Sequence, residues 1–214
     1  MEKNSVLPQT FYNFECNKDL IVNVLSLIKK EKYVKVDSKK NLSSHSLNST
    51  LHKQKEYAEL IDWIYKCINE LKEDLKLQCE RFTITQCWSN CAEFGQKHPE
   101  HLHPNSFLSG ILYLNNSDAK TLFAGENMWN YFKRTDRVMK ISPEFNQELT
   151  VIHYEDCVAG KLILFPSNVI HMVKPNNSSD LYPVPNRYTI SFNAFPSGKI
   201  GNMNFLSGLN IDIL

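Results

Sequence analysis

The sequence lacks a long apolar run, and neither sign of charge is in excess. Its longest apolar stretches, such as LILF at residues 162–165, are far shorter than the roughly 20 residues that span a bilayer as a helix. The 24 Lys and Arg residues nearly balance the 23 Asp and Glu residues, and the formal net charge is +1. This balance creates no overall field that would attract nucleic acid or an anionic membrane. We therefore expect a soluble protein without a membrane or nucleic-acid partner.

The N-terminal residues, MEKNSVLPQTFYNF, also lack the apolar core of a signal peptide. The six cysteines are therefore expected to be reduced thiols in a cytoplasm, since disulfides belong to oxidising compartments. Cys87 and Cys91 are four residues apart, but no second pair of cysteines matches them. Buried thiols explain them better than a zinc knuckle does.

The first third of the chain predicts two helices. LIVNVLSLIKK at 20–30 places apolar residues at helical spacing behind Asn17 and Asp19, which are plausible caps. A second helix is predicted within 52–78, where apolar residues form one stripe. Between them, SKKNLSSHSLNST at 38–50 is polar and predicts a loop or a mobile lid. The stripe consists of Leu60, Ile61, Ile64, Tyr65, Ile68, Leu71 and Leu75.

From Arg81 onward the pattern changes to short β-rich runs separated by Gly, Pro, Asn and Asp. This habit is typical of an antiparallel sandwich or barrel, and such a sheet would cover the stripe of the second helix. We predict one domain of the α+β class, mainly β with N-terminal helices. Residues 1–80 would form a helical segment packed on the core and not independent of it, and residues 81–214 would form the β-core. The runs are RFTITQCW, FLSGILYL, KTLF, LTVIHYE, GKLILF, VIHMVK and RYTISFNAF.

Three of the seven histidines lie at the edges of the predicted strands. His101 and His103 stand immediately before one strand, and His171 follows GKLILFPSNVI. Residues i and i+2 of an extended segment point to the same side, so both members of the pair can bind one metal ion. A third ligand from a distant strand would complete one face of an octahedron, leaving the other face for a cosubstrate and O₂, as in facial-triad iron oxygenases. The pair alone is weak evidence, because histidines at this spacing are common.

Three stretches around these histidines together resemble the 2-oxoglutarate- and Fe(II)-dependent oxygenase superfamily. The resemblance covers about Cys87 to Phe195, half of the chain, and is closest to members with an HxHPNSxxSGxxYL block, which are frequent in bacteria and phages. Trp88, Asn90 and Gly95, which precede this block, also fit. The stretches are HLHPNSFLSGILYLN (101–115), GKLILFPSNVIHMVKP (160–175) and RYTISFN (187–193).

The resemblance implies a double-stranded β-helix for the core, that is, a cupin-like jelly roll. It also implies an enzyme that uses Fe(II), 2-oxoglutarate and O₂, converts 2-oxoglutarate to succinate and CO₂, and usually hydroxylates a prime substrate. If such an enzyme were encoded by a phage, it would act in the cytoplasm of the host.

Residue by residue, His101 matches the first ligand of the family's HxD/E pair, and His171 matches the distal histidine. Arg187 matches the basic residue that grips the far carboxylate of 2-oxoglutarate, a task suited to a planar guanidinium that donates two parallel hydrogen bonds. Thr189, on the same strand face, could add a hydroxyl to that carboxylate. Tyr113 matches a phenol that related enzymes offer to the cosubstrate.

Position 103 departs from the family pattern, because many members carry Asp or Glu where this chain has His103. With three neutral imidazoles, the site has one negative charge fewer than in members with Asp or Glu. This difference should weaken Fe(II) retention or change the metal preference. An alternative assignment is open, in which His98 and Glu100 form the HxE pair of metal ligands, although Pro99 between them is unfavourable in a strand. Glu100 could instead accept a hydrogen bond from a ligand imidazole.

Other interpretations of single residues also stay open. Arg187 could be a surface or salt-bridged arginine, and Tyr113 and Trp88 could be core aromatics. His153 lies in an alternating strand and is expected on its solvent face. Ser109 lacks the strand-to-helix elbow of a serine hydrolase, so nucleophilic catalysis has little support.

Two competing functions remain beside the oxygenase. Three histidines in a β-barrel would equally suit Zn(II) or Ni(II) in a cupin-like metal-binding module without oxygenase activity, or the ligands could be vestigial in a structural protein. The prime substrate is unknown, and we expect loops that include residues 124–150 to build its pocket. An exposed edge strand could pair in a homodimer. The candidates in that loop are Trp129, Tyr131, Phe132 and Arg134.

Overall fold

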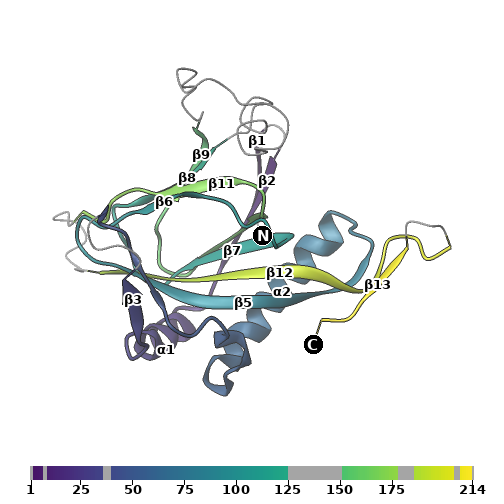
Figure 1. The fold of residues 1–214 in the computed structure, drawn as a ribbon, viewed down its shortest axis with the longest axis horizontal. Coiled ribbons are helices and arrows are strands. Elements are labelled where there is room, and N and C mark those ends of the chain that lie inside the picture. The colour runs from purple at the N-terminus through teal and green to yellow at the C-terminus, as the bar shows by residue number, and fades with distance from the viewer. Residues whose placement is uncertain are drawn as a thin grey trace.

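A computed structural model describes residues 2–6, 9–35, 40–124, 151–177, 186–204 and 208–213 of the chain. Two antiparallel sheets form its centre, and both helices lie on the outer side of the larger sheet (Figure 1). This arrangement agrees with the predicted mainly β architecture with N-terminal helices. The predicted pocket-building loop at 124–150 lies, apart from Ala124, outside the described residues.

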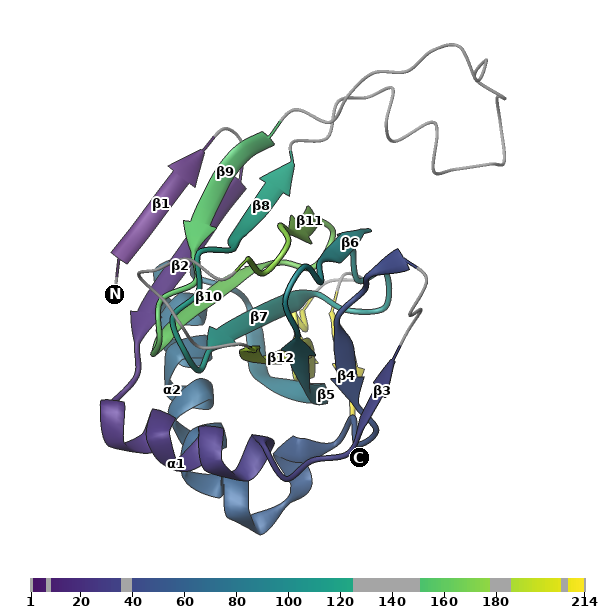
Figure 2. The ribbon, with the colours of Figure 1, turned by 90° about the vertical axis from the view of Figure 1, so that its left-hand side faces the viewer.

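The larger sheet has the order β1-β2-β10-β7-β12-β5-β4-β3, and β13 pairs with β12. The smaller sheet has the order β6-β11-β8-β9 and lies over the larger one (Figures 1 and 2). The strands of the larger sheet are β1 Glu2–Val6, β2 Gln9–Glu15, β3 Tyr33–Lys35, β4 Ser44–Ser46, β5 Cys79–Ala92, β7 Leu108–Tyr113, β10 Lys161–Pro166, β12 Arg187–Ile200 and β13 Leu209–Ile211. Those of the smaller sheet are β6 His98–His101, β8 Lys120–Ala124, β9 Val151–Asp156 and β11 Ile170–Val173.

Both predicted helices are confirmed. Helix α1 spans Lys18–Ile28, and the Asn17 side chain caps it by accepting the backbone N–H of Asp19 at 2.8 Å. Helix α2 spans Ala58–Asp74 after two short 3₁₀ turns, η2 at Leu51–Lys53 and η3 at Lys55–Tyr57. Among the described residues, no helix is long and apolar enough to cross a membrane.

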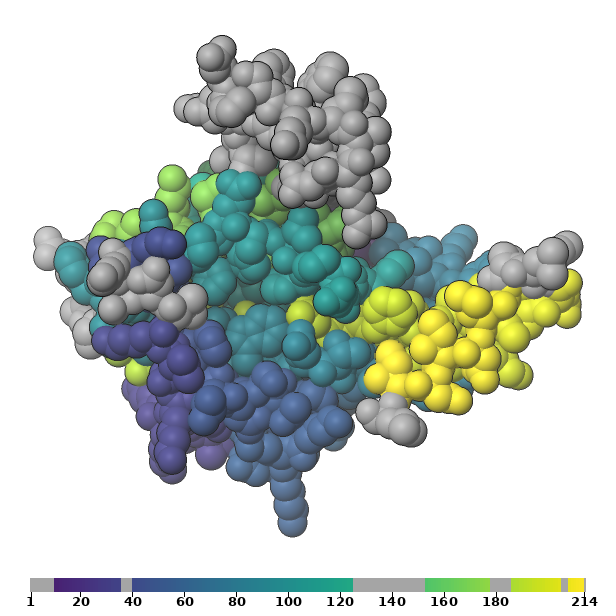
Figure 3. All heavy atoms as spheres, in the orientation of Figure 1, coloured from purple at the N-terminus to yellow at the C-terminus, as the bar shows by residue number. Residues whose placement is uncertain are grey.

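The helical layer and the larger sheet share one apolar core. Most of the predicted stripe of α2 is buried in it, with Leu75 as the exposed exception at the helix end. Alternate residues of β12, such as Ile190 and Phe192, face this core, while the residues between them face the smaller sheet. Gly110 allows this packing, because a Cβ atom there would lie 2.2 Å from the Phe192 ring. The space-filling view shows this helical layer as one mass below the strands (Figure 3).

The first 80 residues also contribute four strands that the sequence analysis did not predict. The clearest is β4, which lies inside the predicted loop at 38–50. Its polar residues are buried because neighbouring strands satisfy them; for example, Ser46 Oγ accepts the backbone N–H of Ser89 at 3.1 Å. Local composition carries no signal for such long-range pairing. The division of the chain at residue 80 stays a prediction.

The prediction that His153 faces solvent is wrong. Its side chain is 18% exposed, and its ring stacks on Phe11 of β2 with centroids 4.9 Å apart. Its Nε2 lies 2.9 Å from Glu155 Oε1, and Lys161 Nζ lies 3.0 Å from Glu155 Oε2. Tyr154, between them, is exposed. The predicted alternation is present from His153 to Asp156, but β2 covers the face that was predicted to be exposed.

Glu155→Gln is expected to destabilise the protein by about 1–3 kcal/mol, because the buried group loses its charge-assisted hydrogen bonds. Burial raises the pKa of Glu155, but hydrogen bonds from Asn13, His153 and Lys161 lower it more, so the net pKa lies below its usual 4.5. A carboxyl with a lowered pKa contributes stability above pH 4.5, and this contribution disappears as the pH falls through the folded-state pKa. The free energies of unfolding of the parent and the variant, measured with urea, should therefore differ at neutral pH and become equal in acid.

Asp156→Asn is the matched control, because Asp156 pairs with Lys120 at 2.6 Å on the exposed side of the same strand. An exposed ion pair contributes only about 0–1 kcal/mol. Equal loss of stability in the two variants would contradict a special role for the buried Glu155.

Candidate metal centre

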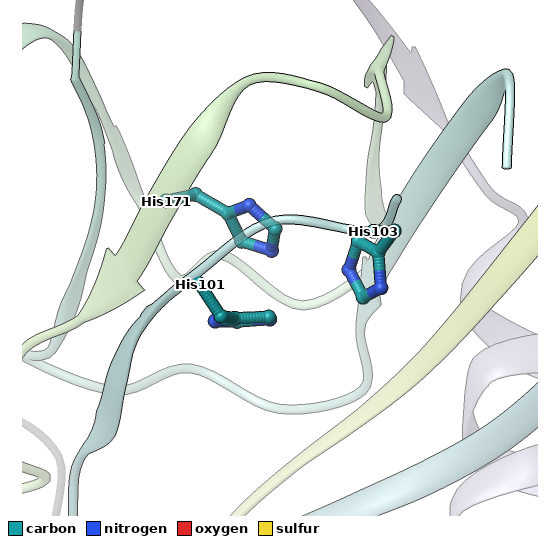
Figure 4. A group of neighbouring side chains, drawn as sticks. All are labelled: His101, His103 and His171. Carbon is teal, nitrogen blue, oxygen red and sulfur yellow. The ribbon is translucent and has the colours of Figure 1, made fainter. Parts of the chain in front are cut away.

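The structure brings His101, His103 and His171 together. His101 ends β6, His103 lies two residues further on, and His171 lies on β11 directly opposite His101 in the strand register. Each ring offers one nitrogen, and these nitrogens all lie within 4.8 Å of one another. Figure 4 shows the three rings converging on one space from two strands and the following turn.

Backbone carbonyls orient two of these rings. His101 Nδ1 lies 2.8 Å from the Pro99 carbonyl oxygen, and His171 Nδ1 lies 3.0 Å from the Val169 carbonyl oxygen. A carbonyl can only accept, so Nδ1 carries the proton and Nε2 keeps its lone pair for a metal. The backbone N–H of His103 donates to the Ser167 carbonyl at 2.9 Å, which ties the third ligand to the turn before β11.

The environment keeps the three rings neutral. Burial lowers the pKa of His171 well below its usual 6.5 and lowers that of His103 to about 4, and neighbouring histidines add to both effects. Burial also lowers the pKa of His101. A metal binds only the unprotonated imidazole. Three neutral nitrogens within 4.8 Å of one another fit a divalent first-row metal such as Fe(II).

The alternative assignment, with His98 and Glu100 as ligands, is not supported. Glu100 is exposed, and neither residue joins the cluster found among the described residues. His98 Nδ1 lies 2.8 Å from Ser43 Oγ instead, and the His98 ring rests 4.6 Å from that of His101. The acceptor for His101 Nδ1 is the Pro99 carbonyl rather than Glu100.

Arg187, Thr189 and Tyr113 line the same cavity as the three histidines. Arg187 is 4% exposed, so the surface interpretation of this residue is wrong. Thr189 lies opposite Tyr113 in the β12–β7 register, and Tyr113 Oη lies 2.5 Å from Thr121 Oγ1. The cavity is narrow, about 40 Å³, so side chains must move to admit a ligand the size of 2-oxoglutarate.

Several residues that line the cavity were not assigned to the site from sequence. Trp88 was weighed as a core aromatic, yet it lies on the cavity wall, with its ring centroid 5.9 Å from that of His103. Trp88 Nε1 donates to Asn90 Oδ1 at 3.2 Å, and Asn90 Nδ2 donates to Thr189 Oγ1 at 3.2 Å. Trp88 and Asn90 are two residues apart on β5, so the sequence alone could have predicted that they share one face of the strand. Further lining residues that were not predicted from sequence include Ser43, Thr121 and Ser191.

Ser109 has a structural role that its sequence context did not show. It is buried and donates to Asn193 Oδ1 at 2.9 Å, and its Oγ lies 2.8 Å from Ser167 Oγ. Since the Ser167 carbonyl holds the backbone of His103, this buried network supports the turn that carries the metal centre.

Ser109→Ala is expected to weaken metal binding about tenfold, since residues that support ligands typically contribute 10–100-fold to metal affinity. The affinity would be measured by anaerobic Fe(II) titration. Ser106→Ala is the control, because Ser106 Oγ bonds only to the carbonyls of Leu108 and Ala194 among the described residues. Unchanged affinity in Ser109→Ala, or an equal loss in Ser106→Ala, would contradict this role.

Two sheets that enclose three converging imidazoles and a buried arginine are the features of a jelly-roll metalloprotein of the oxygenase type. Residues 86–193 match a family model described as "Putative 2OG-Fe(II) oxygenase". The chain belongs to this family, which makes it an oxidoreductase that uses Fe(II), 2-oxoglutarate and O₂. The resemblance seen in the sequence is thus confirmed. No curated protein sequence matches the chain.

Solved structures share the fold at low sequence identity, and this likeness confirms the jelly-roll fold class. A prolyl-4-hydroxylase from Pseudomonas putida is 15% identical with a TM-score of 0.59, over 90% of this chain and 95% of that one. A viral collagen prolyl hydroxylase from Paramecium Bursaria Chlorella virus-1, in complex with 2-oxoglutarate, is 12% identical with a TM-score of 0.56, over 86% and 94%. HygX from Streptomyces hygroscopicus, with nickel and 2-oxoglutarate bound, is 8% identical with a TM-score of 0.56, over 87% and 82%.

Proposed function

We propose that this oxygenase hydroxylates a prime substrate with Fe(II) held by His101, His103 and His171. One atom of O₂ enters the substrate as the hydroxyl, the other enters succinate, and 2-oxoglutarate loses CO₂. The observation that carries the proposal is the placement of three converging imidazoles and a buried guanidinium in one cavity. Fe(II), when bound, supplies the activation of O₂.

Arg187 is proposed to hold the far carboxylate of 2-oxoglutarate, with hydroxyls from Thr189 and Tyr113. In the described residues its side-chain hydrogen bond is a long one, from Nη1 to the Lys174 carbonyl at 3.4 Å. A buried guanidinium remains charged and gains most from an anionic partner. The protein thus supplies orientation at both ends of the cosubstrate and a cavity that excludes bulk water.

The test is anaerobic addition of Fe(II) and 2-oxoglutarate to the metal-free protein, followed in visible light. The expected result is the weak metal-to-ligand charge-transfer band, and succinate production once O₂ is admitted. No band, together with tight Zn(II) or Ni(II) binding, would instead support the cupin-like metal-binding module. No binding of any of the three metals would support vestigial ligands.

His103→Asp is expected to tighten Fe(II) binding by about tenfold, or ~1.4 kcal/mol, because a carboxylate adds the negative charge that three imidazoles lack. Equilibrium titration against a metal-sensitive dye measures the change. The Asp side chain is shorter than His, so His103→Glu is measured beside it. The neutral control His103→Asn should bind more weakly, and weaker binding in both acidic variants would refute the charge argument.

We also propose a cytoplasmic location and a homodimer. All six cysteines lack disulfides in the structure, which suits a reducing compartment. Strands β1, β3, β6 and β9 end the order of their sheets and offer edges for pairing. Light scattering of the purified protein tests the dimer.

A further inference from the structure

A second hollow opens beside the metal centre, between β4 and β5 on one side and β6 on the other. We call it the lateral groove. It has a volume of about 570 Å³, against about 40 Å³ for the cosubstrate cavity. The two share Trp88, His101 and His103, so a ligand in the lateral groove lies directly against the metal ligands.

The floor of the lateral groove is made of amide side chains and one aromatic ring. Gln86, Trp88 and Asn90 lie at every second position of β5, and Asn193 of β12 lies opposite Gln86. Asn193 Nδ2 donates to Gln86 Oε1 at 3.1 Å, which leaves the Gln86 Nε2 group for a ligand. These groups offer both donors and acceptors beside a flat apolar surface.

No described residue that lines the lateral groove is an Asp, Glu, Lys or Arg. Arg187, in the adjoining cavity, is reserved for the far carboxylate of 2-oxoglutarate. A charged substrate group placed here would lose its hydration without gaining a counterion, which is strongly unfavourable. This lining therefore favours an uncharged reacting group.

The lateral groove adjoins another hollow at Leu47, whose side chain is 68% exposed. That hollow has a volume of about 460 Å³, reaches the end of α1 and, unlike the lateral groove, is lined by charged residues, among them Lys30, Glu31 and Lys32. Across the strands, Asn90 is followed by His45 on β4 and by the exposed Val34 on the edge strand β3. A ligand longer than one small metabolite has room along this face.

We propose that the lateral groove binds the prime substrate as an extended polypeptide segment whose reacting residue is uncharged. This inference rests on the proposed function of the metal centre. Peptide carbonyls can accept from the Gln86 Nε2 group, and peptide N–H groups can donate to the amide oxygens of Gln86 and Asn90. Apolar side chains match Trp88 and Leu47.

The experiment uses the full chain with Fe(II), 2-oxoglutarate and O₂ and a pool of short peptides. Their flanks are randomised and their central residue is varied, and mass spectrometry locates any added oxygen atom. Oxygenation is expected only where the central residue is uncharged. Neutral oligosaccharides and nucleosides are assayed in parallel.

Two charge variants test the lateral groove itself. Gln86→Lys and Leu47→Lys should each reduce oxygenation of uncharged peptides about tenfold, equivalent to 1.4 kcal/mol, and Gln86→Lys should admit peptides with a central Asp or Glu. Gln78→Lys, an identical change at an exposed position of the segment before β5, should do neither. Oxygenation of peptides with a central Asp or Glu by Gln86→Lys is a result that a merely structural defect would not produce.

The outcomes separate this inference from the proposed function. No charge-transfer band in the parent protein would count against the proposed function. If the band is normal, three results would overturn the polypeptide proposal. These are equal oxygenation of charged and uncharged peptides, conversion of an oligosaccharide or nucleoside instead of a peptide, and no oxygenation of any peptide. Equal effects of Gln86→Lys and Gln78→Lys would overturn the location.

Discussion

His171→Ala is expected to abolish the charge-transfer band of Fe(II) with 2-oxoglutarate, and the turnover of 2-oxoglutarate with it. The His171 side chain is buried, and its Nδ1–H is held by the Val169 carbonyl, which leaves Nε2 as the metal ligand. Removing it leaves two nitrogen donors. Fe(II) affinity should therefore fall by more than the roughly 10–100-fold typical for residues that only support ligands. Anaerobic titration at visible wavelengths measures the loss.

Thermal unfolding gives a second readout for the same variant. A metal that binds only the folded state raises Tm, so Fe(II) should stabilise the parent protein and leave His171→Ala unchanged. His52→Ala is the matched control, because its ring lies outside the metal centre and both ring nitrogens lack a hydrogen-bond partner within the described part of the chain. A normal band and Tm shift in His171→Ala would exclude His171 as a ligand.

The parts of the site that follow from spacing within one strand could be predicted. His101 and His103 share a side of an extended segment, as do Arg187 and Thr189 on β12, and the structure places all four around one cavity. His171 comes from another strand, and its place opposite His101 was reached through the family resemblance rather than through spacing. The apolar stripe of α2 was predictable for the same local reason.

The errors have one common physical cause. Periodicity shows which residues share a face of a strand, but not which face another element covers. His153 was therefore assigned to solvent although Phe11 covers it. The lateral groove forms between β4 and β6, and no local sequence pattern predicts that these strands lie close together.

Arg187→Gln is expected to raise the Kd for 2-oxoglutarate while leaving Fe(II) binding intact. Removing one partner of a buried, hydrogen-bonded charge pair costs about 2–5 kcal/mol. Since each 1.4 kcal/mol is a factor of ten, the Kd should rise roughly 30-fold to a few thousandfold. The charge-transfer band should then appear only at much higher 2-oxoglutarate concentrations, and KM for 2-oxoglutarate should rise with it.

Arg187→Lys separates charge from shape. Lysine keeps the positive charge but loses the planar fork that binds a carboxylate through two hydrogen bonds, so its Kd for 2-oxoglutarate should lie between those of the parent and Arg187→Gln. The Arg187 guanidinium is buried, and its one hydrogen bond given by the structure is 3.4 Å long, so its removal in the free protein should cost little stability. A loss of Fe(II) binding equal to the loss of 2-oxoglutarate binding would mean that Arg187 supports the whole cavity rather than the cosubstrate.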